Sequence, residues 1–330
     1  MKGNDEDHLH LHPQQNHRHQ QLPFYQRRFW KLSGNYLRNQ KHTAYVILLL
    51  LTYAFGYFTS SKQICCTTPA VSDSVKTVNV FPPATSSTVL ELSNNYHNRF
   101  GSKCANPIPP ELTRFMILDR VFNGTSPYES FPPAHVTHLL RPVRVKGWGS
   151  YGAVFENLIR KVRPRIIIEV GTFLGASATH MAELTRKLGL QTQILCIDDF
   201  RGWPGFRGKI DYVPIQNGDV MLLPQFLQNV IYFNSTESIL PIPFSTESTL
   251  RALCEWGIFG DLIEVDAGHD FQSAWMDINL AHKLLRPGGV LFGHDYFNRF
   301  DNKGVRRAVD LFAKIHGFKV SVDGQHWVIE

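Results

Sequence analysis

Six titratable residues stand at or just after the ends of apolar runs: Glu169, Asp198, Asp266, His269, His294 and Asp295. Histidine titrates near neutral pH, so it can remove a proton from a hydroxyl group. Carboxylates can accept hydrogen bonds from a ligand or bind a cation. Any one of these acids, Asp198 for example, could be an ordinary residue at a strand end. Four acids and two histidines in this pattern are harder to explain as solvated surface, and they predict a common site.

The first of these residues, Glu169, leads into a glycine turn. The β-branched run 166–168 precedes it, Gly171 and Gly175 follow it, and a helical pattern of apolar residues runs from 178 to 188. This is the pattern of a buried parallel strand that continues into a helix through a tight loop. Glycines let the backbone approach a ligand closely, and a helix start offers free N–H groups. The spacing Glu-x-Gly-x-x-x-Gly differs from the Gly-x-Gly-x-x-Gly of dinucleotide-binding folds.

Alternating strand and helix patterns must position the other titratable residues. Strands are expected at 166–170, 193–197, a short one near 241, 262–266, 290–293, 318–322 and 326–329. Helical patterns between them and a terminal pair of strands predict an α/β fold with a doubly wound, seven-stranded, mostly parallel sheet. Ligands of such sheets bind at the carboxyl ends of the strands, where all six titratable residues fall. Residues 151–330 are expected to form this domain, and residues 101–150 an N-terminal helical cap packed on it.

The charge distribution gives no sign of a nucleic-acid partner. The formal net charge is +6, but the first 43 residues hold seven lysines and arginines against three acids, which accounts for +4. The remaining +2 leaves the rest of the chain near neutral. Residues 1–43 are rich in histidine, glutamine and asparagine, and they are expected to be a disordered tail rather than a metal site.

Residues 44–60 are predicted to form a single transmembrane helix that acts as a signal anchor. They lie in a stretch, 43–60, without a charged side chain, and a helix of that length spans about 27 Å, enough for a thin bilayer. The stretch begins too late for a signal peptide and lacks the polar face of a core helix. Basic residues precede it closely at Arg28, Lys31, Arg38 and Lys41, whereas only Lys62 follows closely. The positive-inside rule therefore places the tail in the cytosol and the bulk of the chain in the lumen.

Features after the span agree with a single-pass, type II protein of the endoplasmic reticulum or Golgi membrane. The short span suits these membranes better than the plasma membrane. Residues 61–100 are rich in serine, threonine, proline and asparagine, which predicts a flexible lumenal stem. Asn123 and Asn234 each begin an acceptor sequon for N-glycosylation.

The five cysteines show neither metal-ligand spacing nor a dense disulfide framework. Cys65 and Cys66, at the base of the stem, could link two chains into a homodimer, and an unpaired state is the alternative. Cys196 and Cys254 lie in apolar stretches and are expected to be small buried apolar side chains.

Residues from about 147 to 330 resemble class I S-adenosylmethionine-dependent methyltransferases. The motifs are Glu-Val-Gly-Thr-Phe-Leu-Gly at 169–175, Ile-Asp-Asp at 197–199, Val-Asp-Ala-Gly-His-Asp at 265–270, and Leu-Leu-Arg-Pro-Gly-Gly-Val-Leu-Phe-Gly-His-Asp-Tyr at 284–296. In this order they are similar to the family that includes macrolide-sugar O-methyltransferases and cephalosporin-hydroxylase-like proteins, of the methyltransferase family 24 type. The anchored N-terminal part resembles plant membrane methyltransferase-like proteins.

The resemblance implies a binding site for S-adenosylmethionine. The residues implied are Glu169, Gly171, Thr172, Gly175, Asp198 and Ser245. Glu169, Gly171 and Gly175 would frame the methionine part and the ribose of the cofactor. Asp198 would hold the ribose hydroxyls, and Ser245 lies where the family contacts adenine.

The resemblance also implies roles at the later strand ends. His269 matches the general base of sugar O-methylating relatives, with Asp266 beside it, and the alternative is a helix-start histidine that bonds only Asp266 or the backbone. Metal-dependent relatives bind magnesium at the positions of Asp266, His294 and Asp295. His294 departs from the acidic pattern, and magnesium prefers oxygen ligands, so metal dependence stays open.

The predicted function is S-adenosylmethionine-dependent O-methylation of a hydroxyl group on a saccharide or small molecule in the secretory lumen. A Golgi glycosyltransferase is the first alternative, since it shares the plan of tail, anchor and stem. Its Asp-x-Asp metal motif occurs here only as Asp5-Glu6-Asp7, in the tail. A non-catalytic, membrane-anchored scaffold that keeps the fold is the second alternative.

Overall fold

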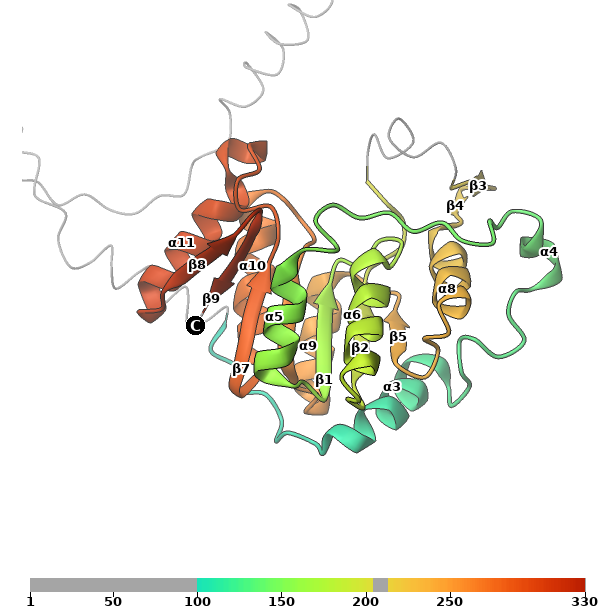
Figure 1. Cartoon of the computed structure of the whole chain (residues 1–330), viewed down its shortest axis with the longest axis horizontal. Coiled ribbons are helices and arrows are strands. Elements are labelled where there is room, and N and C mark those ends of the chain that lie inside the picture. The colour runs from blue at the N-terminus through green and yellow to red at the C-terminus, as the bar shows by residue number, and fades with distance from the viewer. Residues whose placement is uncertain (1–99, 204–212, 330) are drawn as a thin grey trace, which may run out of the picture. The chain divides into compact units, whose positions relative to one another are not determined.

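The computed structural model describes residues 100–203 and 213–329, which belong to one compact unit. A seven-stranded sheet with the order β5-β2-β1-β6-β7-β9-β8 forms its centre (Figure 1). Its strands are β1 Ile166–Val170, β2 Gln193–Ile197, β5 Ile239–Ile242, β6 Gly260–Val265, β7 Leu285–Gly293, β8 Val320–Asp323 and β9 His326–Ile329. The first five are parallel, and β9 runs antiparallel to β7 and β8. The prediction of a doubly wound, mostly parallel sheet is confirmed.

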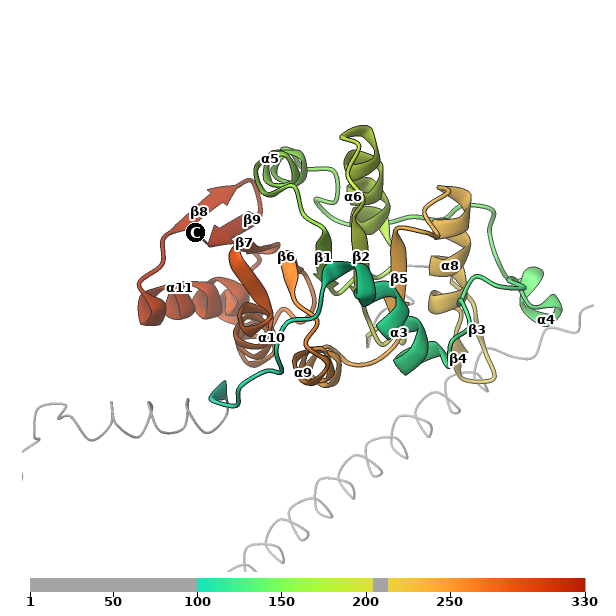
Figure 2. The ribbon, with the colours of Figure 1, turned by 90° about the horizontal axis from the view of Figure 1, so that it is seen from below.

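Helices cover both faces of this sheet (Figure 2). One face carries α5 Ala153–Val162, α6 Ala176–Lys187 and α8 Leu222–Tyr232, and the other carries α9 Thr246–Trp256, α10 Phe271–Lys283 and α11 Gly304–His316. Each face has its own hydrophobic core, and the β1 side chains alternate between them: Ile167 enters one core, Ile166 and Ile168 the other. By the same alternation Glu169 lies on the face covered by α5 and α6.

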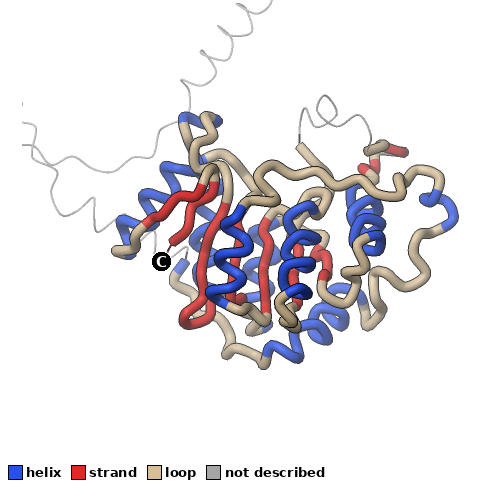
Figure 3. The backbone as a smooth tube through the Cα atoms, viewed as in Figure 1, coloured by secondary structure: helices blue, strands red, loops and turns tan. Residues whose placement is uncertain are grey.

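The loops that could form a site gather along the edge where the parallel strands end (Figure 3). These loops follow β1, β2, β5, β6 and β7, so they carry the titratable residues that the sequence places at strand ends. A two-stranded pair, β3 Ile215–Gln216 and β4 Asp219–Val220, lies apart from the main sheet just before α8. The short 3-10 helix η2 Phe300–Asn302 precedes α11.

The segment 101–150 divides between two edges of the sheet. The 3-10 helix η1 Pro110–Leu112 and α3 Thr113–Phe122 lie at the edge where the strands begin, since Arg114 of α3 bonds the side chain of Gln193, the first residue of β2. After α4 Ala134–Thr137 the chain crosses to the other edge and runs above the strand ends into α5 (Figure 1). Only this second part covers the loops at the site.

The structure corrects the expectation for Cys254, which forms a disulfide with Cys104 across 150 residues of sequence. The segment after Cys104 lies along the end of α9, where Ala105 N–H donates to Cys254 O at 2.9 Å and Ile108 N–H donates to Gly257 O at 2.9 Å. This pairing brings the two sulfurs together, and neither local pattern reveals it. Cys196 is buried and reduced, as expected.

The tail 1–43, the anchor 44–60 and all of the stem 61–100 but its last residue lie outside the described residues, as do Cys65 and Cys66. Among the helices in residues 100–203 and 213–329, none has the length and apolar character to cross a membrane.

Candidate active site

The glycine loop 171–175 brings the end of β1 against the end of β6. Gly171 has φ 91°, and a Cβ at this position would collide with the backbone carbonyl of Asp266. Gly175 has φ 78°, and its Cβ would lie 2.8 Å from the ring of Phe226. Both glycines are therefore required by conformation and by space. The loop ends at the first turn of α6, whose N–H groups lack partners within the helix.

Glu169 is fully buried beside this loop. The hydroxyl of Ser177 donates to its Oε1, whereas Oε2 has no hydrogen-bond partner in the described part of the chain. Burial raises the pKa of Glu169 to about 7, against the lowering effect of the Ser177 hydrogen bond. The predicted cofactor residue Thr172 is also buried, and its hydroxyl likewise lacks a partner among the described residues. Unpartnered polar atoms beside a glycine cradle fit a polar ligand such as the cofactor.

The sequence reasoning missed Glu264, which pairs with Glu169 in the register of β1 and β6. Glu264 is 1% exposed, and its Oε2 has no hydrogen-bond partner in the parts of the chain described. Burial raises its pKa well above the usual value, and the charge of Glu169 adds to the effect. An acid inside the apolar run of β6 is the signal that could have identified it.

Asp198, which follows β2, is hydrogen-bonded to the backbone of the glycine loop. Its Oδ2 accepts a hydrogen bond from Phe173 N–H at 2.9 Å, and its Oδ1 accepts one from Phe200 N–H at 2.8 Å. Each oxygen of a carboxylate can accept more than one hydrogen bond, so Asp198 can still bind ribose hydroxyls. Burial raises its pKa, and the bond from Phe173 lowers it.

Ser245 is the N-cap of α9. Its Oγ accepts a hydrogen bond from Ser248 N–H at 3.4 Å, and the side chain is exposed after the end of β5. The capping role is enough to explain why a serine occupies this position, even if Ser245 binds no ligand. The contact with adenine that the resemblance implies stays a prediction.

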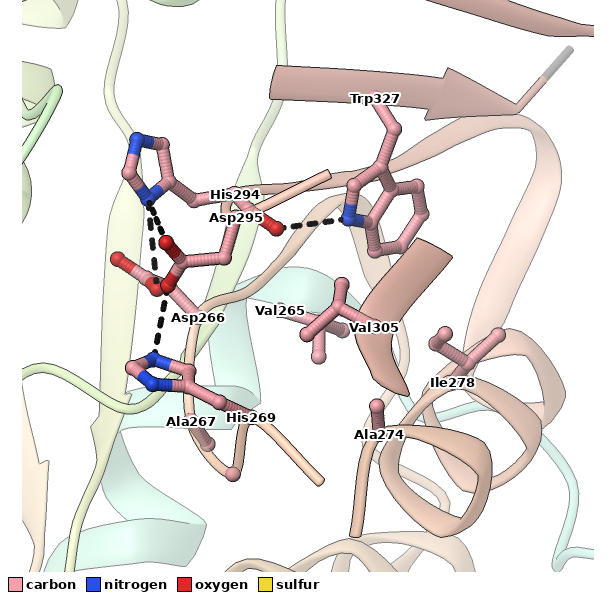
Figure 4. A pocket seen from close by; sticks show the side chains of 11 residues that line it. Val265, Asp266, Ala267, His269, Ala274, Ile278, His294, Asp295, Val305 and Trp327 are labelled. Carbon is pink, nitrogen blue, oxygen red and sulfur yellow. Dashed lines mark hydrogen bonds and ion pairs between the residues drawn. The ribbon is translucent and has the colours of Figure 1, made fainter. Parts of the chain in front are cut away.

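His269 and Asp295 form the closest pair among the predicted catalytic and metal residues (Figure 4). His269 Nε2 lies 2.8 Å from Asp295 Oδ2, so Asp295 is a direct partner of the histidine. His294 Nδ1 lies 3.6 Å from Asp295 Oδ1 and 3.8 Å from Asp266 Oδ1. The structure thus brings together all four residues from the ends of β6 and β7.

Burial and the neighbouring charges shift the pKa values of the residues in this cluster. Burial would raise the pKa of Asp295, but its contacts with His269 and His294 outweigh burial and hold the pKa well below the usual value. Burial raises the pKa of Asp266 to about 6, against the effect of His294. Burial would lower the pKa of His294, but Asp295 and Asp266 raise it overall. Asp295 is therefore the fixed negative charge that orients both histidines.

Close backbone packing holds the catalytic pair in place. Asp295 has φ 61°, and a Cβ on Gly304 would lie 2.8 Å from His269 O and 2.6 Å from Phe271 N. The backbone of His294 is held by Trp327, whose Nε1 donates to His294 O at 3.1 Å. Such packing fixes the direction of each side chain before any ligand arrives.

The side-chain atoms of Asp266, His269 and Asp295 that could ligate a metal all lie within 4.8 Å of one another. His294 Nδ1, on a side chain only 5% exposed, faces the same cluster and makes no hydrogen bond with the described residues. Mixed imidazole and carboxylate ligands suit Mn²⁺, Fe²⁺ or Zn²⁺, whereas Mg²⁺ prefers oxygen alone. The residues therefore fit a transition metal and fit magnesium poorly. Of the predicted set, Asp266 and Asp295 belong to this group, with His269 in the place of His294.

The cluster opens into a pocket at the end of the sheet. Its lining is Val265, Asp266, Ala267, Gly268, His269, Ala274, Ile278, His294, Asp295, Val305 and Trp327 (Figure 4). The chain from the second part of the cap covers His294, since a Cβ on Gly149 would lie 2.5 Å from His294 Nε2. Beside Gly149, the half-exposed Trp148 packs 6.1 Å from the ring of Phe173. The sequence reasoning did not identify these cap residues as part of the site.

One family model matches part of this chain. Residues 168–296 match the model of a family described as a methyltransferase domain, Methyltransf_24, which confirms the resemblance for these residues. Among proteins with curated functions, none matches the chain. The match shows a methyltransferase domain over these residues and counts against the glycosyltransferase alternative.

Three solved structures are similar to this chain. The O-methyltransferase from Bacillus cereus in complex with SAH has 17% identity and a TM-score of 0.42, over 65% of this chain and 95% of that chain. Cofactor-bound Rv0187 from MTB has 17% identity and a TM-score of 0.42, over 68% of this chain and 98% of that chain. CalS11, a calicheamicin methyltransferase, has 16% identity and a TM-score of 0.41, over 78% of this chain and 99% of that chain.

Proposed function

We propose that this S-adenosylmethionine-dependent methyltransferase transfers its methyl group to a hydroxyl oxygen, with His269 as the base. The pair of His269 Nε2 and Asp295 Oδ2 at 2.8 Å is the observation that carries the proposal. The pair lines the pocket at the end of β6, and Gly171 of the glycine loop packs against Asp266 in the same place. A base and a cofactor loop at one strand edge are what O-methylation needs.

When bound, S-adenosylmethionine supplies an electrophilic methyl group and leaves as the neutral thioether. The hydroxyl oxygen of the acceptor forms the new C–O bond while the C–S bond breaks, and the hydroxyl proton passes to the ring of His269. Asp295 accepts the hydrogen bond from Nε2 and so leaves the Nδ1 lone pair as the basic site of the ring. The same carboxylate then stabilises the positive charge that develops on the imidazole.

A metal at Asp266, His269 and Asp295 is the competing use of the same side chains. It would supply a Lewis acid that lowers the pKa of the acceptor hydroxyl. Because a metal-bound nitrogen cannot also accept a proton, His269 would serve either the metal or the proton. Metal analysis of the purified protein separates the two uses. A stoichiometric transition metal would replace the role of His269 as base.

The primary test is isothermal titration of S-adenosylmethionine into the purified full-length chain, followed by a methyl-transfer assay with saccharide and small-molecule alcohols. We expect saturable binding, and a methyl ether as the product. His269→Gln should keep cofactor binding and lose transfer, whereas His138→Gln, at an exposed histidine after α4, should keep both. Absence of binding by a folded protein would overturn the enzyme proposal and favour the scaffold alternative.

We further propose that the acceptor is a lumenal saccharide or small molecule, reached by a domain anchored through residues 44–60. Two observations support a lumenal domain. The disulfide between Cys104 and Cys254 suits an oxidising compartment. Asn123 and Asn234 are both exposed, Asn123 at the C-cap of α3 and Asn234 in a turn just after α8, so oligosaccharyltransferase could reach them.

Glycosidase treatment tests this orientation. The chain expressed in a eukaryotic cell should lose mass when N-glycans are removed. The Asn123→Gln and Asn234→Gln variants should each carry one glycan fewer, and so lose less mass on the same treatment. An unglycosylated chain whose Cys104 and Cys254 react with a thiol reagent in the cell would contradict a lumenal domain.

A further inference from the structure

Helix α8 lies between the cap segment 141–144 and the glycine loop 171–175. Two of its side chains, Gln225 and Asn229, are amides one helical turn apart, 2% and 0% exposed. A buried amide is costly unless its donors and acceptor are satisfied by hydrogen bonds. The partners of these two amides therefore show what the helix face is built to hold.

Both amides bind the backbone of the cap as a neighbouring strand would. Gln225 Oε1 accepts from Arg141 N–H at 2.9 Å, and Gln225 Nε2 donates to Arg141 O at 3.0 Å. Asn229 Oδ1 accepts from Arg144 N–H at 2.7 Å, and Asn229 Nδ2 donates to Arg144 O at 2.8 Å. Gln225 Nε2 also donates to Asn229 Oδ1 at 3.1 Å, which ties the two amides to each other.

Asn229 differs from Gln225 because it also reaches the glycine loop. Its Nδ2 donates a second hydrogen bond to Leu174 O at 2.9 Å, and this bond is fully buried. Leu174 lies between the two loop glycines and is itself 0% exposed. The same helix contacts the loop once more through Phe226, whose ring fills the space where Gly175 would carry a Cβ. The helix thus fixes the loop from outside the sheet.

The cap segment that Asn229 holds continues directly into the residues over the active site. Arg144 is followed by Trp148 and by Gly149, which packs against His294. One side chain therefore ties the backbone that covers the pocket to the backbone that cradles the cofactor. Movement of either segment alone would break a hydrogen bond of Asn229.

We infer that Asn229 is a positioning residue for the cofactor: its amide joins the cap at Arg144 to the glycine loop at Leu174, and so presets the loop for binding. The inference rests on the proposed function of the loop as the S-adenosylmethionine site. Asn229 itself does not line the active-site pocket. It acts through Leu174, whose carbonyl direction sets the turn from Gly171 to Gly175.

The test compares Asn229→Leu with Gln225→Leu in the full-length chain. Both variants remove a buried amide and its hydrogen bonds to the cap, but only Asn229→Leu removes the bond to Leu174. We expect Asn229→Leu to raise the Kd for S-adenosylhomocysteine about tenfold, the effect of one lost buried hydrogen bond. Gln225→Leu should leave the Kd unchanged, although both variants lower the melting temperature. Equal changes in Kd, or no change in Asn229→Leu, would overturn the inference.

Hydrogen exchange without ligand keeps the test independent of the proposed function. The amides of 171–175 should exchange faster in Asn229→Leu than in Gln225→Leu or the unaltered chain. If Asn229→Leu fails to fold, Asn229→Asp takes its place, since it keeps the acceptor oxygen and loses both donors. Failure of the unaltered chain to bind S-adenosylhomocysteine would refute the cofactor site, whereas normal binding with unchanged exchange in the variant would refute the role of Asn229.

Discussion

Asp295 organises the charge of the site because it faces both histidines at once. The replacement Asp295→Asn keeps the shape of the side chain but removes the charge that orients His269 and stabilises its protonated form. We expect kcat to fall about 10²- to 10⁴-fold, the usual contribution of a positioned general base. The Kd for S-adenosylmethionine should not change, because Asp295 lies at the end of β7 and outside the glycine loop.

The measurement is steady-state kinetics beside isothermal titration of the same preparation. Asp119→Asn, at an exposed residue of α3 on the opposite edge of the sheet, is the matched control and should behave as the unaltered chain. A variant that keeps its kcat would show that Asp295 neither orients His269 nor stabilises its protonated form during transfer.

A second residue, Asp277, gives a pH dependence of stability. Burial raises its pKa to about 6, and the hydroxyl of Thr246, which donates to its Oδ1 at 2.7 Å, only partly opposes burial. Between pH 4 and 6 the unfolded chain releases this proton before the folded chain does. The free energy of unfolding therefore falls as pH rises through this window, by about 3 kcal/mol in total at pH 7.

The Asp277→Asn variant should lack this decline, so its stability relative to the unaltered chain rises from pH 4 to pH 7. Urea unfolding at both pH values measures the difference, and Asp119→Asn again serves as control. Parallel pH profiles for Asp277→Asn and the unaltered chain would mean that Asp277 titrates normally in the folded state.

At the scale of the elements, the glycine loop combines a backbone requirement with a packing requirement. Gly171→Ala would place a Cβ against the carbonyl of Asp266 at φ 91°. We expect a loss of at least about 2 kcal/mol in the free energy of unfolding, together with loss of cofactor binding. Gly189→Ala is the matched control, since Gly189 has φ 65° but nothing within 4 Å, and it should cost only about 1 kcal/mol. Equal costs for the two variants, measured by urea unfolding, would show that the approach of β1 to β6 is not tight.

The elements were largely predictable because their signals are local. Runs such as 166–170 and 193–197 are apolar strands flanked by turn residues, and the structure places strands over those ranges. The positions of the titratable residues at the strand ends followed from the same runs. The contact between His269 and Asp295 did not follow, because Asp295 lies far from His269 in the sequence and only the fold brings the two side chains together. Asn229 and Gln225 were also missed, since a buried amide in an apolar helix shows its role only through distant backbone partners.

At the scale of the whole molecule, the disulfide between Cys104 and Cys254 ties the segment that enters the domain to α9. The bond closes a loop of 150 residues, which removes much conformational freedom from the unfolded chain. Loss of such a bond from a domain typically costs about 2–5 kcal/mol. The variants Cys104→Ser, Cys254→Ser and the double variant should therefore share one lowered melting temperature.

Reductant gives the deciding comparison. It should lower the melting temperature of the unaltered chain to that of the double variant, and leave the double variant unchanged. The active-site pocket lies at the edge where the strands end, whereas Cys254 closes α9, next to Gly257 and the start of β6. Cofactor affinity below the melting temperature should therefore be the same with and without the bond. If reductant instead destabilised both proteins equally, Cys104 and Cys254 would not be joined in solution, and the support for an oxidising compartment would fall with them.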